Sequence, residues 1–325
     1  MKAFVTGGAG FIGSHVVDRL IEGGNEVIVY DNMSTGIEDF ISHHYENPRF
    51  KLTQGDVLDL KKLSQEMKGA DIVFHFAAHA DVRSGFNDHK IDLEQNLIGT
   101  INVLEAMKEG GVKKIAFAST SSVYGDAAII PTPENYPFSP TSLYGSSKAA
   151  AETYIATFCE YYNMTAYIFR FVSWVGERYT HGLVFDFLNK LKKDPSTLHV
   201  LGDGTQKKSY LYVKDGVDAI FTIIEKSKEK MNIYNLGNDE IINVTDSAKV
   251  IIDEAKYKNV KLVYEGGDKG WIGDNKYVLL DTKKLQSLGW KASKDTREGL
   301  RITTRYLLDN PKIVKKRNEK SIFKI

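Results

Sequence analysis

The sequence predicts an α/β protein with a doubly wound parallel sheet and a smaller C-terminal lobe. The first observation is an apolar run, Lys2–Thr6, that leads directly into a glycine-rich turn and then an amphipathic helix. The second is that strand-like and helix-like runs alternate along the chain to about residue 172. The third is that Ile72–Ala78 is apolar throughout, which is typical of a parallel strand that helices cover on both faces.

The composition indicates a globular protein and excludes several classes of partner. The 325 residues carry a formal net charge of +1, so no global field attracts nucleic acid or an acidic membrane, and we expect neither as a partner. The single cysteine, Cys159, cannot form an internal disulfide, and we expect it in the core. The apolar runs are shorter than the roughly 18 residues of a membrane span, and the first residues form a strand instead of a leader. We therefore expect a cytoplasmic protein.

The glycine-rich turn and the acidic residue that follows it indicate a dinucleotide site. Gly7, Gly10 and Gly13 follow a strand and open a helix over about residues 14–22, and Asp31 ends the next strand. Glycines let the backbone approach a pyrophosphate, and the helix N-terminus supplies free N–H groups. Asp31 would accept hydrogen bonds from the adenosine ribose and repel a 2′-phosphate, which favours NAD over NADP. The alternative is a structural turn with flexible glycines.

The next strands end in small or polar residues, as expected at the ligand edge of a parallel sheet. Gln54–Val57 closes the third strand, and Ile72–Ala78 ends in two alanines that leave room for a cofactor. His75 and His79 have no further metal ligands at useful spacing, so we expect core or rim histidines and no metal. The later predicted elements are a helix over 92–108, a strand over 115–118 and a strand over 166–170.

A tyrosine and a lysine mark the candidate catalytic helix. Tyr144 and Lys148 are four positions apart and precede strong helix formers, so both side chains are expected on one helix face. An ammonium beside a phenol favours the phenolate and lowers the phenol pKa from about 10. The pair therefore predicts a general base that works near pH 7. The alternative is an ordinary surface pair on a helix.

Three motifs together resemble one known family. They are the spacing of the three glycines, the Tyr-x-x-x-Lys pair, and Ser119–Gly125, which is similar to the signature Ser-(Ser/Thr)-x-x-Val-Tyr-Gly. Over nearly its whole length the sequence resembles the extended branch of the short-chain dehydrogenase/reductase superfamily, in which NAD-dependent epimerases act on nucleotide sugars. The resemblance implies a Rossmann fold that binds NAD and a C-terminal lobe that binds the nucleotide sugar.

The resemblance also implies roles for individual residues. Thr120 would bind the reacting sugar oxygen, Tyr144 would take its proton, and Lys148 would hold the nicotinamide ribose. The residues expected to bind the cofactor are Gly7, Gly10, Phe11, Ile12, Gly13, Asp31, Asn32, Ser34, Thr35, Gly36, Asp56, Val57, Phe76, Ala77, Ala78, Asn96, Tyr144, Lys148 and Phe171. The residues expected to bind the substrate are Thr120, Ser173, Arg178, Lys208, Tyr210 and Trp271.

The segments expected to bind the substrate depart from the family pattern. Ser173 replaces an Asn and Glu177 replaces a Pro in the segment after the sixth strand. Lys208 stands where an Arg usually holds the diphosphate, and a Lys keeps the charge but loses the bidentate geometry. Trp271 replaces a second Arg and is either a packing residue or a stacking surface for a base. We therefore expect Lys208, with Arg178 as the second cation, to hold the diphosphate.

Two serines bear on the reaction. Ser121 and Ser122 replace the Asp-Glu pair of the family's 4,6-dehydratases, and neither hydroxyl can remove a C5 proton. The resemblance therefore implies epimerisation of a nucleotide sugar at C4 through a 4-keto intermediate, of the UDP-glucose/UDP-galactose type. The alternatives are a sibling nucleotide-sugar enzyme, which is a UDP-N-acetylhexosamine or UDP-uronate 4-epimerase or a 4,6-dehydratase, and, in another class, a non-catalytic dinucleotide-sensing protein. A sensing protein would be expected to lose the catalytic Tyr, Lys or Thr, which are all present.

The resemblance also implies how the chain is divided and assembled. Residues 1–172 plus 209–236 would form the dinucleotide-binding domain, and residues 173–208 plus 237–325 the nucleotide-sugar-binding lobe. We expect a homodimer through the helices at about 92–109 and 145–162, because the second offers small side chains for close helix approach.

Overall fold

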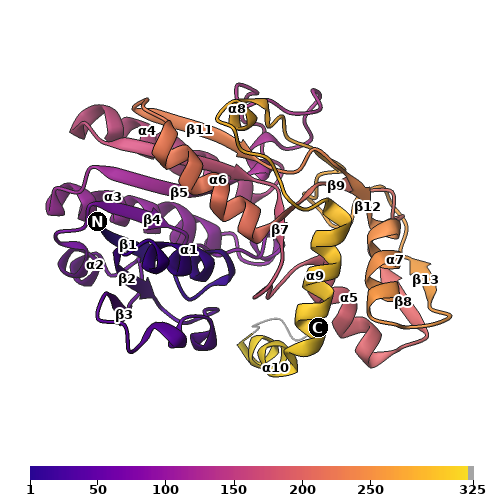
Figure 1. Cartoon of the computed structure of the whole chain (residues 1–325). Helices are drawn as coiled ribbons and strands as arrows, with labels where there is room; N and C mark the ends of the chain where they lie inside the picture. The colour runs from indigo at the N-terminus through magenta and orange to yellow at the C-terminus, as the bar shows by residue number, and fades with distance from the viewer. Residues whose placement is uncertain (321–325) are drawn as a thin grey trace.

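A seven-stranded parallel sheet forms the centre of the molecule. The computed structural model describes residues 1–320, and its main sheet has the strand order β11-β6-β5-β4-β1-β2-β3 (Figure 1). This order confirms the predicted doubly wound α/β fold. The strands are β1 (Lys2–Thr6), β2 (Glu26–Asp31), β3 (Phe50–Gln54), β4 (Ile72–His75), β5 (Lys114–Thr120), β6 (Thr165–Phe171) and β11 (Met231–Leu236).

The strand order reverses at β1, which pairs in parallel with β2 on one side and with β4 on the other. From β1 the chain first proceeds through β2 to β3 and then returns to build the other half of the sheet from β4 outward. In open parallel sheets, ligands bind outside the carboxyl ends of the strands at such a reversal. The glycine-rich turn, Asp31, Ala77 and Thr120 all lie at this edge, because each follows or ends one of these strands.

Helices cover both faces of the sheet, so its strands are buried on both sides. On β1, Ala3 and Val5 belong to the core cluster that contains the apolar face of the first helix, whereas Phe4 belongs to the opposite cluster. The predicted stripe of that helix, Val16, Val17, Leu20 and Ile21, is buried. The helices of one layer are α1 (Phe11–Glu22) and α6 (Val213–Lys226), and those of the other are α2 (Leu60–Met67), α3 (Gly99–Gly110) and α4 (Leu143–Tyr162).

A smaller lobe lies beyond the carboxyl edge of the sheet, at the right of Figure 1. Its short strands pair as β10-β7, β12-β9-β14 and β13-β8. The strand β10, which we expected to return to the dinucleotide half, pairs with β7, whereas β11 does join the main sheet. The elements of the smaller lobe are β7 (Ser173–Val175), α5 (Leu183–Lys193), β8 (Thr197–Val200), β9 (Lys207–Lys208), β10 (Tyr210–Tyr212), β12 (Ile242–Asn243), α7 (Val244–Glu254), β13 (Lys261–Tyr264), β14 (Tyr277–Val278), α9 (Thr296–Asp309) and α10 (Pro311–Lys320). The short helix α8 (Lys283–Gln286) packs beside β11 of the main sheet.

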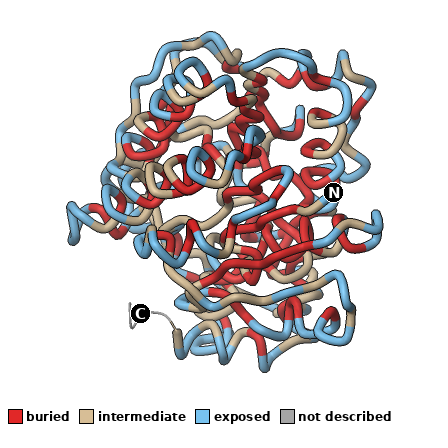
Figure 2. Tube along the Cα trace, turned by 90° about the vertical axis from the view of Figure 1, so that its left-hand side faces the viewer, coloured by how far each residue is buried: buried red, intermediate tan, exposed pale blue. Residues whose placement is uncertain are grey.

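Short helical segments complete the edge where the strands end. The predicted helix from Asp92 begins as a π-helical segment and becomes α-helical at Gly99. The short segments are η1 (Glu38–Phe40), η2 (Ser42–His44), η3 (Ser84–Phe86), η4 (Leu93–Ile98) and η5 (Ser121–Tyr124). Figure 2 shows buried residues concentrated in the middle of the molecule and exposed residues around its rim. Within residues 1–320, every helix is too short or too polar to cross a membrane.

Candidate active site

The glycine-rich turn has the geometry of a phosphate-binding cradle. Gly7 adopts a positive φ of 68°, and a Cβ at this position would lie 2.6 Å from the Ala77 backbone nitrogen. A Cβ at Gly13 would collide with the Gly7 carbonyl oxygen. Helix α1 begins at Phe11 without a side-chain cap or an acidic residue in its first turn. The free N–H groups and positive dipole of this helix end, including those of Phe11 and Ile12, therefore suit a pyrophosphate.

Asp31 is buried and fixed at the end of β2. Its Oδ2 accepts a hydrogen bond from the Ala9 N–H at 3.0 Å, and its Oδ1 accepts one from the Met33 N–H at 2.8 Å. Burial raises the pKa of this carboxyl, and the two backbone hydrogen bonds oppose the rise. A Cβ at Gly36 would lie 2.8 Å from Asp31 Oδ1, so the following loop can fold back here only with glycine. This geometry places a carboxylate where an adenosine ribose is expected.

The other predicted adenosine residues surround Asp31 on neighbouring strand ends. Asn32 donates a side-chain hydrogen bond to Asp56 Oδ2 at 2.9 Å, which joins the ends of β2 and β3. Val57 is buried against Gly99, whereas Ser34 and Thr35 are exposed on the loop. Helix α10 also reaches this loop, because Lys320 Nζ donates to the Met33 and Gly36 carbonyl oxygens at 2.7 and 2.6 Å. No sequence pattern predicted this contact between the loop and the last described helix.

Four further residues that were expected to bind the cofactor lie at the ends of β4 and β6. Phe76, Ala77 and Ala78 directly follow β4 and are partly buried. Phe171 ends β6 and packs on Trp174, with their ring centroids 4.5 Å apart. Gly7 and Ala77 approach closely, so this strand end and the phosphate cradle form one continuous surface.

Thr120 and Tyr144 meet, as the sequence predicted. Thr120 ends β5, and its hydroxyl accepts a hydrogen bond from the Ser122 N–H at 3.1 Å. The Ser142 hydroxyl caps α4 by accepting from the Gly145 N–H at 3.1 Å, so the helix begins at Leu143 and Tyr144 lies in its first turn. The Thr120 hydroxyl faces the Tyr144 phenol and acts to lower the pKa of that phenol. This pair can hold a sugar hydroxyl and receive its proton.

Lys148 does not act on Tyr144 as predicted. Its Nζ donates to the Ala118 carbonyl oxygen at 2.9 Å and lies 4.7 Å from the centre of the Phe117 ring. The pKa of Tyr144 is raised to about 12, first by burial and second by the Asp92 charge, and the contact with Thr120 opposes the rise. Burial also lowers the pKa of Lys148 to about 8. The prediction of a lowered phenol pKa is therefore wrong for this structure, because sharing a helix face does not aim the ammonium at the phenol.

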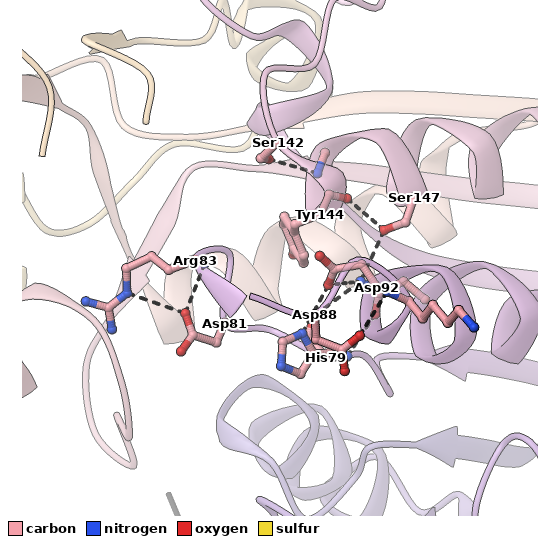
Figure 3. A network of polar contacts seen from close by, with 11 residues as sticks. His79, Asp81, Arg83, Asp88, Asp92, Ser142, Tyr144 and Ser147 are labelled. Carbon is pink, nitrogen blue, oxygen red and sulfur yellow. Dashed lines mark hydrogen bonds and ion pairs between the residues drawn. The ribbon is translucent and has the colours of Figure 1, made fainter. Parts of the chain in front are cut away.

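A polar network that the sequence did not predict lies beside Tyr144 (Figure 3). Asn96 Nδ2 donates to Asp92 Oδ1 and to the Ser147 hydroxyl, both at 3.2 Å, and its Oδ1 accepts from the His79 N–H at 2.8 Å. His79 Nδ1 lies 3.0 Å from Asp92 Oδ1. Asn96 therefore holds the loop after β4 against α4, and His79 belongs to the rim of the site. His75 is a core residue between Thr6 and Thr100, and burial lowers its pKa to about 3.

A buried ion pair joins the catalytic helix α4 to strand β6 of the sheet. Arg170 Nη2 on β6 lies 2.7 Å from Glu152 Oε2 on α4, and both side chains are buried. The Ser119 hydroxyl also donates to Glu152, and Arg170 donates to the Tyr124 hydroxyl at 2.8 Å. Glu152 stands four residues after Lys148 on the same helix face, but this spacing does not identify Arg170 on β6 as its partner.

The predicted substrate residues lie mostly on the smaller lobe. Lys208 Nζ lies 2.8 Å from Asp274 Oδ1 and also donates to the Asn275 carbonyl oxygen. Tyr210 is buried in β10, whereas Ser173 is exposed at the start of β7. Trp271 is partly buried, close to Gly273.

The segment around Gly273 connects this lobe to the catalytic helix. The Thr141 hydroxyl donates to the Gly273 carbonyl oxygen at 2.9 Å and contacts Asn275 Oδ1 at 3.0 Å. A Cβ at Gly273 would lie 2.7 Å from the Thr141 carbonyl oxygen, so the two segments are in close contact. The lobe therefore reaches the residues that directly precede Tyr144.

Arg178 forms an ion pair with helix α1, which the sequence did not predict. Its Nη2 lies 2.8 Å from Asp18 Oδ2 on α1, and its backbone adopts a positive φ of 63°. Asp18 Oδ1 also contacts His44 Nε2 at 2.7 Å and His43 Nε2 at 3.0 Å, a spacing that a metal ion could use. The guanidinium on the same carboxylate opposes a cation there. The expectation that Arg178 serves the diphosphate therefore lacks support from its contacts.

The comparisons with known proteins agree with this arrangement. Residues 3–237 match the model of the NAD dependent epimerase/dehydratase family. The chain is 35% identical over 313 residues to a provisionally assigned UDP-glucose 4-epimerase of Methanocaldococcus jannaschii, covering 94% of this chain and 98% of that protein. It is 33% identical over 310 residues to UDP-glucuronic acid decarboxylase 4 of Arabidopsis thaliana, covering 92% and 67%.

A dehydratase and a solved epimerase structure are also similar. The dTDP-D-glucose 4,6-dehydratase of Mus musculus is 30% identical over 324 residues, covering 95% of this chain and 89% of that protein. A crystal structure of a UDP-galactose 4-epimerase superposes with a TM-score of 0.85 at 37% identity, covering 95% of this chain and 99% of that one. The similar proteins therefore share the fold and differ in the reaction that they catalyse.

Proposed function

Because this chain belongs to the NAD-dependent epimerase/dehydratase family, we propose that it epimerises a nucleotide sugar at C4, with a UDP-hexose of the glucose/galactose type as substrate. NAD is its cofactor. The observation that carries the proposal is a complete Thr120–Tyr144 pair beside two serines at the end of β5. Such a site can exchange a proton at the sugar 4-hydroxyl, but it has no carboxylic acid or carboxylate at the next two positions.

The two serines favour epimerisation over the reactions of the other relatives. A 4,6-dehydratase needs a base to remove the C5 proton, and a decarboxylase needs an acid to protonate C5 after carbon dioxide leaves. Ser121 and Ser122 are partly buried in η5, directly after Thr120, and neither hydroxyl is an effective acid or base near pH 7. C4 epimerisation needs neither group, because the proton and the hydride that leave the sugar return to it.

The residues on the ligand edge fit NAD. The cradle of Gly7 and Gly13, which any Cβ would fill, and the uncapped start of α1 would hold the pyrophosphate. Asp31 would accept the adenosine ribose hydroxyls and would repel a 2′-phosphate, which is the basis for NAD over NADP. When bound, NAD accepts a hydride from C4 of the sugar and returns it.

In the proposed mechanism Thr120 binds the sugar 4-hydroxyl and Tyr144 removes its proton. A phenol with a pKa of about 12 is almost entirely protonated at neutral pH and cannot accept the sugar proton, so its pKa has to fall when the ligands bind. Lys148 would contribute by turning from the Ala118 carbonyl oxygen toward the nicotinamide ribose and the phenol. Tyr144 then returns the proton when the hydride re-enters on the other face of the 4-keto sugar.

A panel of nucleotide sugars tests this function. The protein would be incubated with UDP-, dTDP-, GDP- and CDP-sugars, including N-acetylated and uronic forms, and the products would be separated and identified. We expect C4 epimers, with a UDP-hexose turned over fastest. A 4-keto-6-deoxy product or a pentose product would replace this proposal with dehydration or decarboxylation, and an N-acetylated or uronic epimer would identify the sibling activity.

The surface also supports the expected homodimer. Leu93 and Ile98 on η4 and Tyr154 and Tyr161 on α4 are exposed, with Tyr161 73% exposed, and η4 packs beside α4. Large apolar side chains on two neighbouring helices suit an interface with a second copy of the chain.

We also propose that residues 1–172 plus 209–236 form the dinucleotide-binding domain and that residues 173–208 plus 237–325 form the nucleotide-sugar-binding lobe. We propose a cytoplasmic location for the protein.

A further inference from the structure

The last described helix, α10, packs one of its faces against the loop that follows β2. Ile313, Lys316 and Lys320 fall at the spacing i, i+3 and i+7, so their side chains lie on the same helix face. Ile313 joins Ile37 and Phe40 of the loop in a small buried cluster that is separate from the two main cores. A helix late in the sequence therefore packs on a loop early in it (Figure 1).

Two lysines of this helix face bond the loop, and they differ in what they hold. Lys316 Nζ lies 2.7 and 2.9 Å from the two carboxylate oxygens of Asp39, in an exposed ion pair. Lys320 Nζ donates to the carbonyl oxygens of Met33 and Gly36, at 2.7 and 2.6 Å, and these contacts are partly buried. Exposed ion pairs stabilise little, whereas hydrogen bonds from a charged donor are strong. Lys320 is therefore the contact that we expect to hold the loop.

The two residues that Lys320 bonds both touch Asp31. The Met33 N–H donates to Asp31 Oδ1 at 2.8 Å. A Cβ at Gly36 would lie 2.8 Å from Asp31 Oδ1 and 3.0 Å from Ala9 Cβ, so Gly36 packs directly on both residues. The next residue, Ile37, donates its N–H to the Ala9 carbonyl oxygen at 2.9 Å. The loop that Lys320 holds is therefore the one that fixes the carboxylate expected to receive the adenosine ribose.

The local sequence does not favour the conformation of this loop. Met33 has a positive φ of 60°, a left-handed backbone that a Met side chain rarely adopts. Ser34 and Thr35, between the two carbonyl groups that Lys320 bonds, are exposed. The Lys320 ammonium bridges the two sides of this turn, so it supplies a contact that keeps the turn closed.

Other contacts fix α10 independently of the loop. Arg317 Nε donates to the Thr180 carbonyl oxygen at 3.2 Å. The side chains of Asn318 and Asn189 are hydrogen-bonded to each other at 3.3 and 3.4 Å, and Asn189 lies on α5 of the smaller lobe. The helix is therefore a platform from which Lys320 can hold the loop in place.

We propose that Lys320 is a positioning residue for NAD: its ammonium holds the Met33 and Gly36 carbonyl oxygens and so keeps the surroundings of Asp31 in the conformation that receives the adenosine ribose. This inference deepens the proposed NAD site and rests on its assignment to Asp31, but not on the reaction at the sugar. A loop that is already ordered spends little of the binding free energy on ordering when NAD arrives.

The size of the effect follows from the population of loop conformations. The apparent Kd of a ligand equals its intrinsic Kd divided by the fraction of the protein in the binding-competent state. Loss of hydrogen bonds from a charged donor changes such an equilibrium by about tenfold or more. Lys320→Met should therefore weaken NAD binding by about tenfold, and the change should appear mainly as faster dissociation.

Dissociation of NAD can be measured without any sugar. Each protein would be loaded with NAD and incubated with an excess of ¹⁴C-labelled NAD, and the label that stays bound after rapid gel filtration would be followed with time. Lys320→Met should exchange its cofactor about tenfold faster than wild type. Lys315→Met is the matched control and should exchange at the wild-type rate, because Lys315 is 81% exposed and pairs with Glu319 on the same helix. Equal rates in wild type and folded Lys320→Met protein overturn the proposal.

A second measurement separates positioning from a purely structural role. Amide hydrogen exchange should accelerate in Lys320→Met at Met33 and Ile37, whose N–H groups donate to Asp31 and Ala9. A residue that only stabilised α10 would lower the free energy of unfolding in urea and leave both these amides and the NAD exchange rate unchanged, which would contradict the proposal. Lys320→Gln is the second variant if Lys320→Met does not fold. Its amide is one bond shorter than the ammonium, and it should accelerate NAD exchange in the same way.

Variants of Asp31 distinguish failure of this inference from failure of the proposed site. If Asp31→Ala leaves NAD exchange unchanged, the assignment of Asp31 to the ribose is wrong, and the inference falls with it. If Asp31→Ala accelerates exchange and Lys320→Met does not, the ribose site stands and only the role of Lys320 is overturned. In the Asp31→Ala background Lys320→Met should have a smaller effect than in wild type, and an equal effect would contradict action through Asp31. If no nucleotide sugar is turned over, the proposed epimerase function fails while NAD exchange still decides the role of Lys320.

Discussion

Replacing Glu152 with glutamine should destabilise the protein strongly. The variant keeps the shape of the side chain but removes the charge of the Glu152 carboxylate. That carboxylate accepts three hydrogen bonds from Arg170 and one from Ser119. The two side chains are 4% and 3% exposed, so the guanidinium left behind would be buried without a counter-charge. Removing one partner of such a pair costs about 3–5 kcal/mol. That is a large part of the 5–15 kcal/mol by which folded proteins are typically stable.

The same helix offers a matched control. Glu160 on α4 pairs with Lys230 at 3.0 Å, but these side chains are 75% and 41% exposed. Exposed pairs contribute about 0.2–1 kcal/mol, so Glu160→Gln should lower the free energy of unfolding by less than about 1 kcal/mol. Urea unfolding followed by circular dichroism would measure both variants. A Glu152→Gln loss below about 1 kcal/mol, or one equal to that of Glu160→Gln, would refute the argument.

Four further predictions concern the site and the assembly. Tyr144→Phe should lower kcat by about 10²–10⁴-fold with bound NAD unchanged, and turnover close to wild type would remove Tyr144 from the mechanism. Protein denatured after purification should release NAD, and mainly NADP would contradict the role of Asp31. Lys208→Ala should raise KM roughly ten- to hundredfold, from the loss of about 1.5–3 kcal/mol of charged hydrogen bonding, while the exposed control Lys214→Ala should not. An unchanged KM would place the diphosphate elsewhere. Sedimentation at micromolar concentration should show a dimer that Tyr161→Glu dissociates, and a wild-type monomer would reject the interface.

The parts of the fold that the sequence predicted correctly are those fixed by local patterns. The glycine spacing and the acid that ends the second strand predicted a strand, a turn, a helix and a second strand in that order. Gly7 lies in the turn and Asp31 ends β2, as this order requires. Thr120 and Tyr144 meet because one ends a strand and the other opens the helix that packs beside it. These placements depend on backbone topology, which apolar periodicity and turn residues specify.

The parts that the sequence did not predict depend on side-chain direction and on contacts distant in sequence. Helical spacing puts Lys148 and Tyr144 on one face, but it does not say that the ammonium extends to the Ala118 carbonyl oxygen. Arg178 pairs with Asp18 across 160 positions of sequence, and no local pattern encodes that contact. Asp92 resembled an ordinary residue at a helix start, because nothing in the sequence around it signals the π-helical segment that follows it.

The bond between Thr141 and Gly273 has a consequence for building hybrid enzymes. The residues directly before the catalytic helix pack closely against residues of the smaller lobe, although they belong to the first half of the chain. A chimera that took residues 271–275 from a relative with a different sugar preference would meet a foreign partner at Thr141 and Ser142. The exchangeable unit is therefore discontinuous, and a graft intended to change the sugar should carry residues 140–142 with it so that Tyr144 keeps its position.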